Sequence, residues 1–354
     1  MARTSKRFLD LSKDEEQHAL DLYRKSIVID CHQDSLMTDE YILKMRDTSI
    51  AAVNLDGGSF EKMAEKHMII DTHPDIMTGP ISTAQEMVEA KKKGKIAVFL
   101  GAESADEVLR SASSSDHLTI NLDLLHFFHR LGLRIIQPTY NDRNVFADGC
   151  NETANGGLSN LGLELVEKMN RLNLIADCSH VGIKTTLDLC EHARFVVCTH
   201  SNARAVCDNV RNRTDEEIKA IAEKDGVMGL VSFPTFVKWT RTGKGEWPTI
   251  EDLLDHVDYI DKVIGARHVG VGLDLVEGTT VLGPITLGKG LGRWPRVYGS
   301  PGPDRFYHYT EQLDSTTSLP NLAKGLVARG YSDDEIEQVL GENWLRVFRK
   351  AWGK

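Results

Sequence analysis

Residues Ser26–Asp34 have the sequence SIVIDCHQD, an apolar run that ends in His32, Gln33 and Asp34. An apolar run of this length, with little alternation between polar and apolar residues, is typical of a strand buried on both faces. The same pattern recurs along the chain: a short apolar run is followed directly by His, Asp or Glu. This recurrence predicts a sheet of buried parallel strands with polar side chains collected at one edge.

Six further runs share this Val-, Ile- and Leu-rich composition, and with Ser26–Cys31 they make seven predicted strands. They are Lys95–Leu100, Leu133–Gln137, Leu174–Cys178, Phe195–Cys198, Val227–Ser232 and His268–Val271. Helical patterns lie between them, such as Leu161–Leu172, which places apolar residues at helical spacing. Capping boxes at Thr214–Glu217 and Ser332–Glu335, and a weaker one at Thr249–Asp252, indicate helix starts.

Strands that alternate with helices favour an α/β fold with a parallel sheet. We expect a (β/α)8 TIM barrel of the metal-dependent hydrolase type, as a single catalytic domain over residues 1–354, although the eighth strand is not identified. An open doubly wound sheet is the alternative. The nucleotide-binding versions of that fold are disfavoured because the chain has no G-x-G-x-x-G after its first strand and no G-x-x-x-x-G-K-[ST]. The Gly- and Pro-rich segment Gly283–Pro303 is expected to form a long functional loop.

Polar residues follow five of the predicted strands, at the end where barrel enzymes build their active sites. These residues are His32 and Asp34, Glu103, His180, His200 and Asp274. A His-x-Asp pair on an extended segment puts both side chains on one side, and imidazole with carboxylate suits zinc or a similar divalent cation. A single histidine after a strand is more often structural, but five such coincidences favour a metal site.

A second D-x-H-x-D string, at Asp71–Asp75, matches the form of Asp30–Asp34 and is an alternative candidate for metal binding. Pro74 interrupts it and no buried strand of comparable length precedes it, so we expect His73 to be structural.

Composition excludes several other classes. The net charge of −10 and a pI near 5.7 argue against a nucleic-acid or anionic-membrane surface. No secretory h-region is visible, and no apolar run approaches the roughly 20 residues that span a bilayer. The six cysteines lack C-x-x-C spacing and are expected to be reduced thiols, which predicts a cytoplasmic location.

The ordered set of motifs resembles the renal (membrane) dipeptidase family of binuclear zinc metallopeptidases. The resemblance rests on V-I-D-x-H-x-D-x-L at Val28–Leu36, G-x-E at Gly101–Glu103, D-x-S-H at Asp177–His180, H-S-x-A-R at His200–Arg204, R-N at Arg211–Asn212, V-G-x-G-x-D at Val269–Asp274 and N-x-L-R-V-F at Asn343–Phe348. Each motif is weak alone, but together they occur in family order over nearly the whole chain.

The resemblance implies a role for each of these residues. His32 and Asp34 would bind one Zn²⁺, His180 and His200 the other, and Glu103 would bridge the two. Asp274 would take the proton from a metal-bridging hydroxide or water and pass it to the leaving amine. Arg211 would hold a substrate carboxylate, since an Arg fork pairs with a carboxylate through two hydrogen bonds. A surface salt bridge is the alternative for Arg211, and Asp177 is a candidate partner for a ligand histidine.

Two departures from the family pattern affect the substrate pocket. The family has a substrate-binding histidine in a T-H-N string, where this chain has Thr139-Tyr140-Asn141. Tyr140 is therefore the expected substrate contact, as a neutral donor. At the catalytic aspartate the family usually has D-F-D-G, where this chain has Asp274-Leu275-Val276-Glu277-Gly278.

The resemblance implies a zinc-dependent dipeptidase that tolerates a D-residue at the C-terminal position. The alternatives are a binuclear amidohydrolase acting on another small amide or ester, such as an N-acyl amino acid, and a catalytically silent metal- or partner-binding barrel. The expected partner is a small dipeptide, without nucleic acid or membrane. A homodimer is implied by the family alone.

Overall fold

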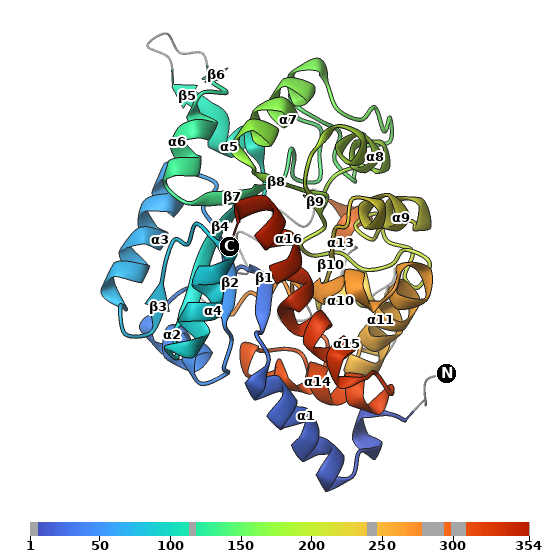
Figure 1. Ribbon diagram of the computed structural model, residues 1–354. Coiled ribbons are helices and arrows are strands. Elements are labelled where there is room, and N and C mark those ends of the chain that lie inside the picture. The colour runs from blue at the N-terminus through green and yellow to red at the C-terminus, as the bar shows by residue number, and fades with distance from the viewer. Residues whose placement is uncertain (1–5, 113–117, 239–245, 278–293, 299–308, 354) are drawn as a thin grey trace.

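The fold was examined in a computed structural model that describes residues 6–112, 118–238, 246–277, 294–298 and 309–353. Eight parallel strands form a ring that is surrounded by helices (Figure 1). Around the ring these strands are β10 (Met228–Leu230), β11 (Val269–Val271), β1 (Ile29–Gln33), β2 (Ala52–Asp56), β4 (Ile96–Ala102), β7 (Leu133–Ile136), β8 (Ile175–Asp177) and β9 (Val196–Val197). A parallel bridge between Cys198 and Met228 joins the last strand to the first. The predicted (β/α)8 barrel is confirmed.

The eighth strand, which the sequence pattern did not reveal, is β2. Its sequence AVNLD contains one alanine and one asparagine, so it has fewer large apolar residues than its neighbours. Asn54 is nevertheless buried and donates a hydrogen bond from Nδ2 to the Cys31 carbonyl at 2.8 Å. A polar side chain is tolerated inside a barrel strand when it has such a partner.

The seven predicted strands are all present, but their bounds shift. The first begins at Ile29 instead of Ser26 and continues to Gln33, so His32 belongs to the strand itself. The last begins at Val269, because His268 ends a 3-10 turn, Ala266–His268. The remaining strands differ from prediction by one or two residues at their ends.

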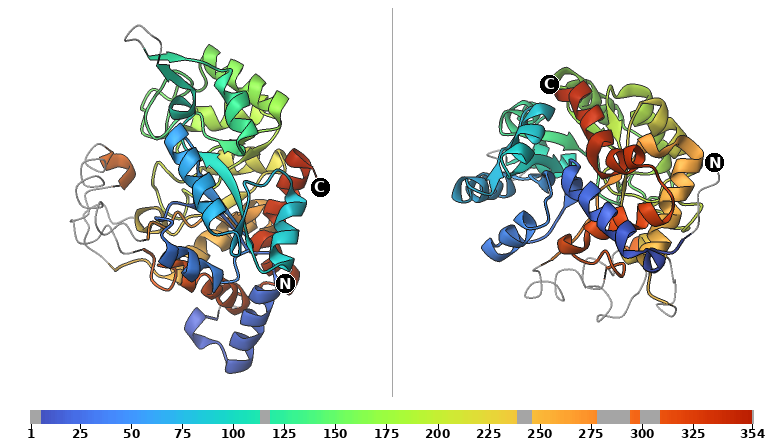
Figure 2. Two further views of the ribbon diagram at one scale, coloured as in Figure 1. Left: turned by 90° about the vertical axis from the view of Figure 1, so that its left-hand side faces the viewer. Right: turned by 60° about the horizontal axis from the view of Figure 1, so that its bottom comes forward.

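Helices cover the outside of the ring in every view (Figure 2). They are α1 (Lys13–Lys25), α2 (Asp39–Arg46), α3 (Phe60–Thr72), α4 (Ala84–Lys92), α5 (Ala105–Leu109), α6 (Leu124–Arg130), α7 (Asn160–Leu172), α8 (Ile183–His192), α9 (Asp215–Glu223), α10 (Pro234–Val237), α11 (Ile250–Ile264), α13 (Pro295–Tyr298), α14 (Pro320–Ala328), α15 (Asp333–Glu337) and α16 (Asn343–Trp352). The helix predicted over Leu161–Leu172 is α7, and the three predicted capping boxes start α9, α15 and α11. A short strand β3 (Met77–Thr78) pairs with β4, and β5 (Arg110–Ala112) and β6 (Leu118–Ile120) form an antiparallel hairpin.

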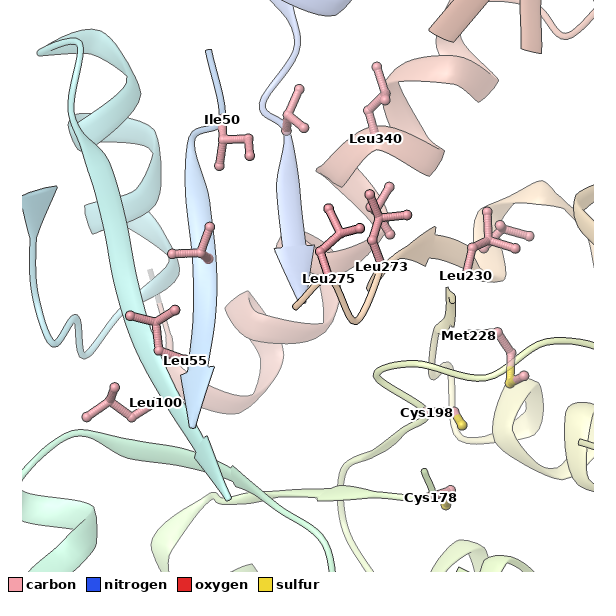
Figure 3. Close-up of a cluster of buried hydrophobic side chains, with 14 of the residues drawn as sticks. Ile50, Leu55, Leu100, Cys178, Cys198, Met228, Leu230, Leu273, Leu275 and Leu340 are labelled. Carbon is pink, nitrogen blue, oxygen red and sulfur yellow. The ribbon is translucent and has the colours of Figure 1, made fainter. Parts of the chain in front are cut away.

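Two apolar layers hold the barrel together. The outer layer packs strand residues such as Leu55, Leu100 and Met228 against the helices (Figure 3). The inner layer fills the ring itself and is closed at the amino ends of the strands by α16, whose Trp344 and Phe348 are fully buried. Because this end is plugged, only the carboxyl ends of the strands are available for a site.

Within the part of the chain that the structure describes, no helix is long and apolar enough to cross a membrane. The six cysteines are all free thiols. Most of the predicted loop Gly283–Pro303 lies outside the described residues; Trp294 and α13 are its described part.

Candidate active site

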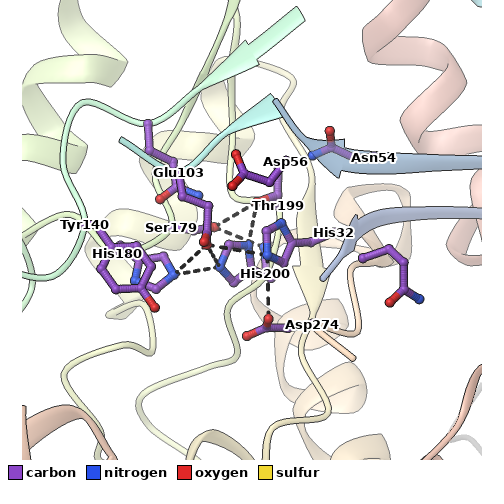
Figure 4. A network of polar contacts seen from close by, with 12 residues as sticks. His32, Asn54, Asp56, Glu103, Tyr140, Ser179, His180, Thr199, His200 and Asp274 are labelled. Carbon is purple, nitrogen blue, oxygen red and sulfur yellow. Dashed lines mark hydrogen bonds and ion pairs between the residues drawn. The ribbon is translucent and has the colours of Figure 1, made fainter. Parts of the chain in front are cut away.

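Four of the predicted metal ligands meet at the carboxyl ends of the strands (Figure 4). His32 lies in β1, Glu103 follows β4 directly, and His180 and His200 stand three residues beyond β8 and β9. Parallel strands of a barrel deliver the residues at their carboxyl ends to one common mouth. The contacts therefore join positions that are distant in sequence but equivalent in the fold.

The three histidines converge on a single oxygen, Oε1 of Glu103. Its distances to the Nε2 atoms of His32, His180 and His200 are 3.4, 3.2 and 3.5 Å. The rings of His32 and His200 are stacked with centroids 3.9 Å apart. Three imidazole nitrogens around one carboxylate are a donor set of the kind that binds zinc.

Neighbouring side chains fix which nitrogen of two histidines carries the proton. Nδ1 of His180 lies 2.8 Å from Oδ1 of Asn141, an oxygen that can only accept. Nδ1 of His200 lies 2.7 Å from Oγ1 of Thr199, which donates its own proton to Asp177 at 2.5 Å and so accepts from the ring. Both histidines therefore direct an unprotonated Nε2 into the site, the arrangement that a metal ligand requires.

Two observations show that these residues fit a cation. The Nε2 atoms of His180 and His200 are only 2.9 Å apart, and two lone pairs at that distance repel unless a positive charge lies beside them. His32 Nε2 is buried and has no hydrogen-bond partner among the described residues. Buried polar atoms are normally satisfied, so an orphaned ring nitrogen facing a carboxylate points to a missing ligand.

The electrostatics of the pocket keep the imidazoles neutral and Glu103 charged. Burial lowers the pKa of His200 to about 4, and burial together with His200 lowers the pKa of His32 to about 4. Burial and nearby Arg211 hold the pKa of His180 well below its ordinary value. Burial opposes ionisation of Glu103, but His32 and His180 hold its pKa well below the usual range. Neutral imidazoles beside an ionised carboxylate are the forms that coordinate a metal.

Asp274 and Asp34 lie at the edge of this cluster. Oδ1 of Asp274 is 3.6 Å from His32 Nε2, and burial and the charge of Glu103 raise the pKa of Asp274 well above its ordinary value. Asp34 makes no direct contact with the three histidines in the described structure, and its side chain is exposed. The ligand role of Asp34 stays a prediction from the sequence.

Arg211 is fully buried, so the alternative of a surface salt bridge does not hold. Its Nη1 and Nη2 donate to Ser201 Oγ and the His200 carbonyl at 3.1 and 3.2 Å, and its guanidinium lies 5.0 Å from the Phe236 ring centroid. Its Nε has no partner among the described residues. A buried cation whose partners are neutral oxygens is costly without an anion.

Tyr140 lies against the candidate metal ligand His180. Its ring stacks on His180 with centroids 4.0 Å apart, and its hydroxyl is 2.9 Å from that of Tyr298.

His73 lies outside this group of residues. It follows α3 and contacts the Ile69 carbonyl and Asp39.

Three supporting residues were not predicted. Asn141 orients His180, Thr199 orients His200, and Gln137 donates to Asp177 at 2.8 Å. Asn141, His180 and Asp274 all have positive φ angles, of 58°, 63° and 58°, which are uncommon outside glycine and concentrate at functional sites. The T-x-N string contained Asn141, but nothing in it indicated a contact with His180.

Comparison with known proteins agrees with the geometry. The model of the membrane dipeptidase family (peptidase family M19) matches residues 57–284, which is more than half of the chain. That match begins after His32 and Asp34 and does not include them.

Individual relatives are also similar. A dipeptidase of Aspergillus oryzae, aclJ, is 28% identical over 294 residues, which cover 82% of this chain and 60% of that protein. The chain thus spans less than two thirds of this relative's length. The solved structure of an amidohydrolase from Pseudomonas aeruginosa is 26% identical, with a TM-score of 0.79 over 95% of this chain and 99% of that one.

A metallopeptidase from Rhodobacter sphaeroides shares the fold at 21% identity, with a TM-score of 0.71 over 93% of this chain and 100% of that one. Its structure was solved with a phosphinate mimic of the dipeptide L-Ala-D-Ala. The matched family model, the barrel and the residues gathered at its mouth lead to one conclusion: this chain belongs to the membrane dipeptidase family, peptidase family M19.

Proposed function

We propose that this protein is a zinc-dependent dipeptidase that hydrolyses the peptide bond of a small dipeptide with a free terminal carboxylate. The observation that carries the proposal is the convergence of three imidazole nitrogens on Glu103, two of them unprotonated, with Asp274 beside them. His32 and Asp34 would hold one Zn²⁺, His180 and His200 the second, and Glu103 would lie between them. Bound zinc would acidify a shared water and polarise the scissile carbonyl.

The chain's own residues supply the other steps. Asp274 would take a proton at its carboxylate and return it to the leaving amine, and its backbone N–H holds it to the His32 carbonyl at 3.1 Å. Arg211 would pair with the substrate carboxylate, which would provide the anion that its surroundings lack. Tyr140 would donate from its hydroxyl to a substrate oxygen.

Tolerance of a D-residue at the C-terminal position is part of this proposal. It is supported by the L-Ala-D-Ala mimic bound to the Rhodobacter sphaeroides relative. We also propose a cytoplasmic location, supported by the free cysteines, and a homodimer, supported by family membership alone.

The first test combines elemental analysis of the purified protein with dipeptide hydrolysis before and after chelation. About two zinc ions per chain and chelator-sensitive turnover are expected. Asp274→Asn should keep the metal and lower kcat by at least roughly 100-fold, as loss of a general acid–base group does. If Asp274→Asn retains full turnover, the proton-transfer role is wrong, and absence of metal would refute the site.

Arg211→Ala should raise KM for free dipeptides by about 10- to 100-fold, because a charged hydrogen-bonding partner is lost. A dipeptide capped as its C-terminal amide is the matched control, since it has no carboxylate to lose. Equal effects on both substrates would contradict the clamp.

A second candidate keeps the metal centre but changes the substrate to another amide or ester, such as an N-acyl amino acid. It is favoured by Tyr140, a neutral phenol where the family has an imidazole, and by Glu277, which is held by Lys44 and by the Thr316 backbone N–H at 2.7 Å. The pocket wall after Asp274 therefore differs from the family's. Turnover of N-acyl substrates without dipeptide turnover would select this candidate.

A further inference from the structure

A chain of hydrogen bonds joins the candidate metal ligand His180 to the hydroxyl of Tyr140. His180 Nδ1 donates to Asn141 Oδ1 at 2.8 Å, and Asn141 Nδ2 donates to the hydroxyl oxygen of Tyr298 at 3.4 Å. That hydroxyl lies 2.9 Å from the hydroxyl of Tyr140. The two ends of this hydrogen-bond series lie against each other, because the Tyr140 ring stacks on the His180 ring.

Aromatic packing holds both phenols in position. Trp294 meets the Tyr140 ring edge-on with centroids 5.5 Å apart. Tyr298, from α13, is only 7% exposed and packs against Phe233 and Phe236 at 5.6 and 5.9 Å. Neither hydroxyl is free to swing toward bulk water without moving a ring.

The order of donors follows from what each atom can do. Asn141 Oδ1 accepts from both His180 and Cys150 Sγ, so its Nδ2 is the atom left to donate to Tyr298. A hydroxyl has a single proton, and if Tyr298 gives its proton to Tyr140, the proton of Tyr140 remains available. Tyr298 is the only hydrogen-bond partner of the Tyr140 hydroxyl in the described part of the chain.

We propose that Tyr298 is a positioning residue: it accepts from Asn141, donates to Tyr140, and thereby directs the Tyr140 proton to the carbonyl oxygen of the scissile bond. The relay rests on the proposed hydrolytic function and adds a residue that belongs to none of the predicted motifs. Because each donor polarises the next, the relay strengthens a neutral hydrogen bond as negative charge develops on the substrate oxygen. The group that accepts the hydrogen bond from Tyr140 is thus the substrate carbonyl oxygen, which gains negative charge during hydrolysis of an amide or ester.

A double-mutant cycle on the full-length, zinc-loaded enzyme tests the relay. Tyr140→Phe and Tyr298→Phe should each lower kcat by about 10- to 100-fold with KM changed less than about twofold, as expected for a hydrogen bond made in the transition state. The double variant should be no slower than Tyr140→Phe, because Tyr298 acts only through Tyr140. Tyr259→Phe, which removes a surface hydroxyl bonded to Asp215, is the matched control and should behave as wild type.

Readouts besides activity separate positioning from folding. Zinc content should be unchanged in both variants, and affinity for a phosphinate analogue of alanyl-alanine, measured by calorimetry, should fall in parallel with kcat. If Tyr298→Phe does not fold, Asn141→Asp is a second variant that tests whether Tyr298 directs the Tyr140 proton. A carboxylate at position 141 accepts from Tyr298, which then draws the proton of Tyr140 away from the substrate.

Three results would overturn the relay. Multiplicative losses in the double variant would mean that the two hydroxyls act independently. A larger loss in Tyr298→Phe than in Tyr140→Phe would make Tyr298 the substrate donor. Wild-type kcat in Tyr298→Phe would leave it without a role. If wild-type enzyme hydrolyses neither dipeptides nor N-acyl substrates, the proposed function is wrong. In that case binding of the phosphinate analogue tests the relay independently, and unchanged binding in Tyr298→Phe would contradict it.

Discussion

Exchanging one oxygen of Asp177 should reverse the tautomer of His200. Asp177 Oδ2 accepts from Thr199 Oγ1 at 2.5 Å and from Gln137 Nε2 at 2.8 Å, and Thr199 in turn accepts from His200 Nδ1. In Asp177→Asn the new amide group donates to Thr199 Oγ1, whose hydroxyl then donates a hydrogen bond to His200 Nδ1. The ring is left with its proton on Nε2, the atom that faces Glu103. A protonated nitrogen cannot bind a metal.

The magnitude follows from the cost of restoring the original tautomer. That leaves a buried donor or acceptor without its hydrogen-bond partner, which costs about 1–3 kcal/mol. The expected effect is a metal affinity lowered by about 10- to 100-fold, in the range seen when the partner of a ligand histidine is removed. The fold should survive, because Gln137 Oε1 has no partner among the described residues and its amide can rotate to accept from the new group.

The assay is zinc binding in competition with a chromophoric chelator. Asp188→Asn is the matched control. Asp188, in α8, is also a buried carboxylate and accepts from the Leu158 backbone N–H at 2.9 Å, but it forms no hydrogen bond or ion pair with a candidate ligand among the described residues. Both variants should lose stability, and only Asp177→Asn should lose zinc affinity. The reasoning is refuted if Asp177→Asn binds zinc within about twofold of wild type.

Two further predictions concern stability. Burial lowers the pKa of His256 to about 4. Its neutral ring accepts from the Ala203 N–H and donates to the Val237 carbonyl. Its contribution to stability is complete above its unfolded pKa of about 6.5 and is lost as pH falls toward 4, so wild type should lose about 2 kcal/mol more than His256→Gln between pH 6.5 and 5 in urea denaturation. Gly270→Ala would place a Cβ 2.4 Å from Trp344 Nε1 and should cost about 1–3 kcal/mol by overpacking. Combination with Trp344→Phe should cost less than the sum of the two single changes, and strict additivity would show that the clash is not the cause.

The barrel could be predicted because each buried strand contributes its own apolar run and the register between strands is not needed to recognise the fold. The site could be placed for the same reason: a residue that directly follows a parallel strand must lie at the carboxyl mouth, whatever the rest of the chain does. This explains why Glu103, His180 and His200 meet although they are far apart in sequence. β2 was missed because Ala52 and Asn54 dilute its apolar pattern, and Asn54 is acceptable there only through a partner on another strand.

The orientation of the site could not be predicted, because it depends on contacts that no local pattern encodes. Asn141 meets His180 only after the chain has turned through a positive φ, and Tyr298 reaches Asn141 from a segment more than 150 residues later. A motif records which residue can bind a metal, whereas the proton on its far nitrogen is set by whichever oxygen the fold brings against it. The positions of the candidate metal ligands are therefore set by the strand ends. Their tautomers, on which metal binding would depend, are set by contacts of the assembled barrel. Asp177→Asn tests this distinction because it alters no predicted ligand.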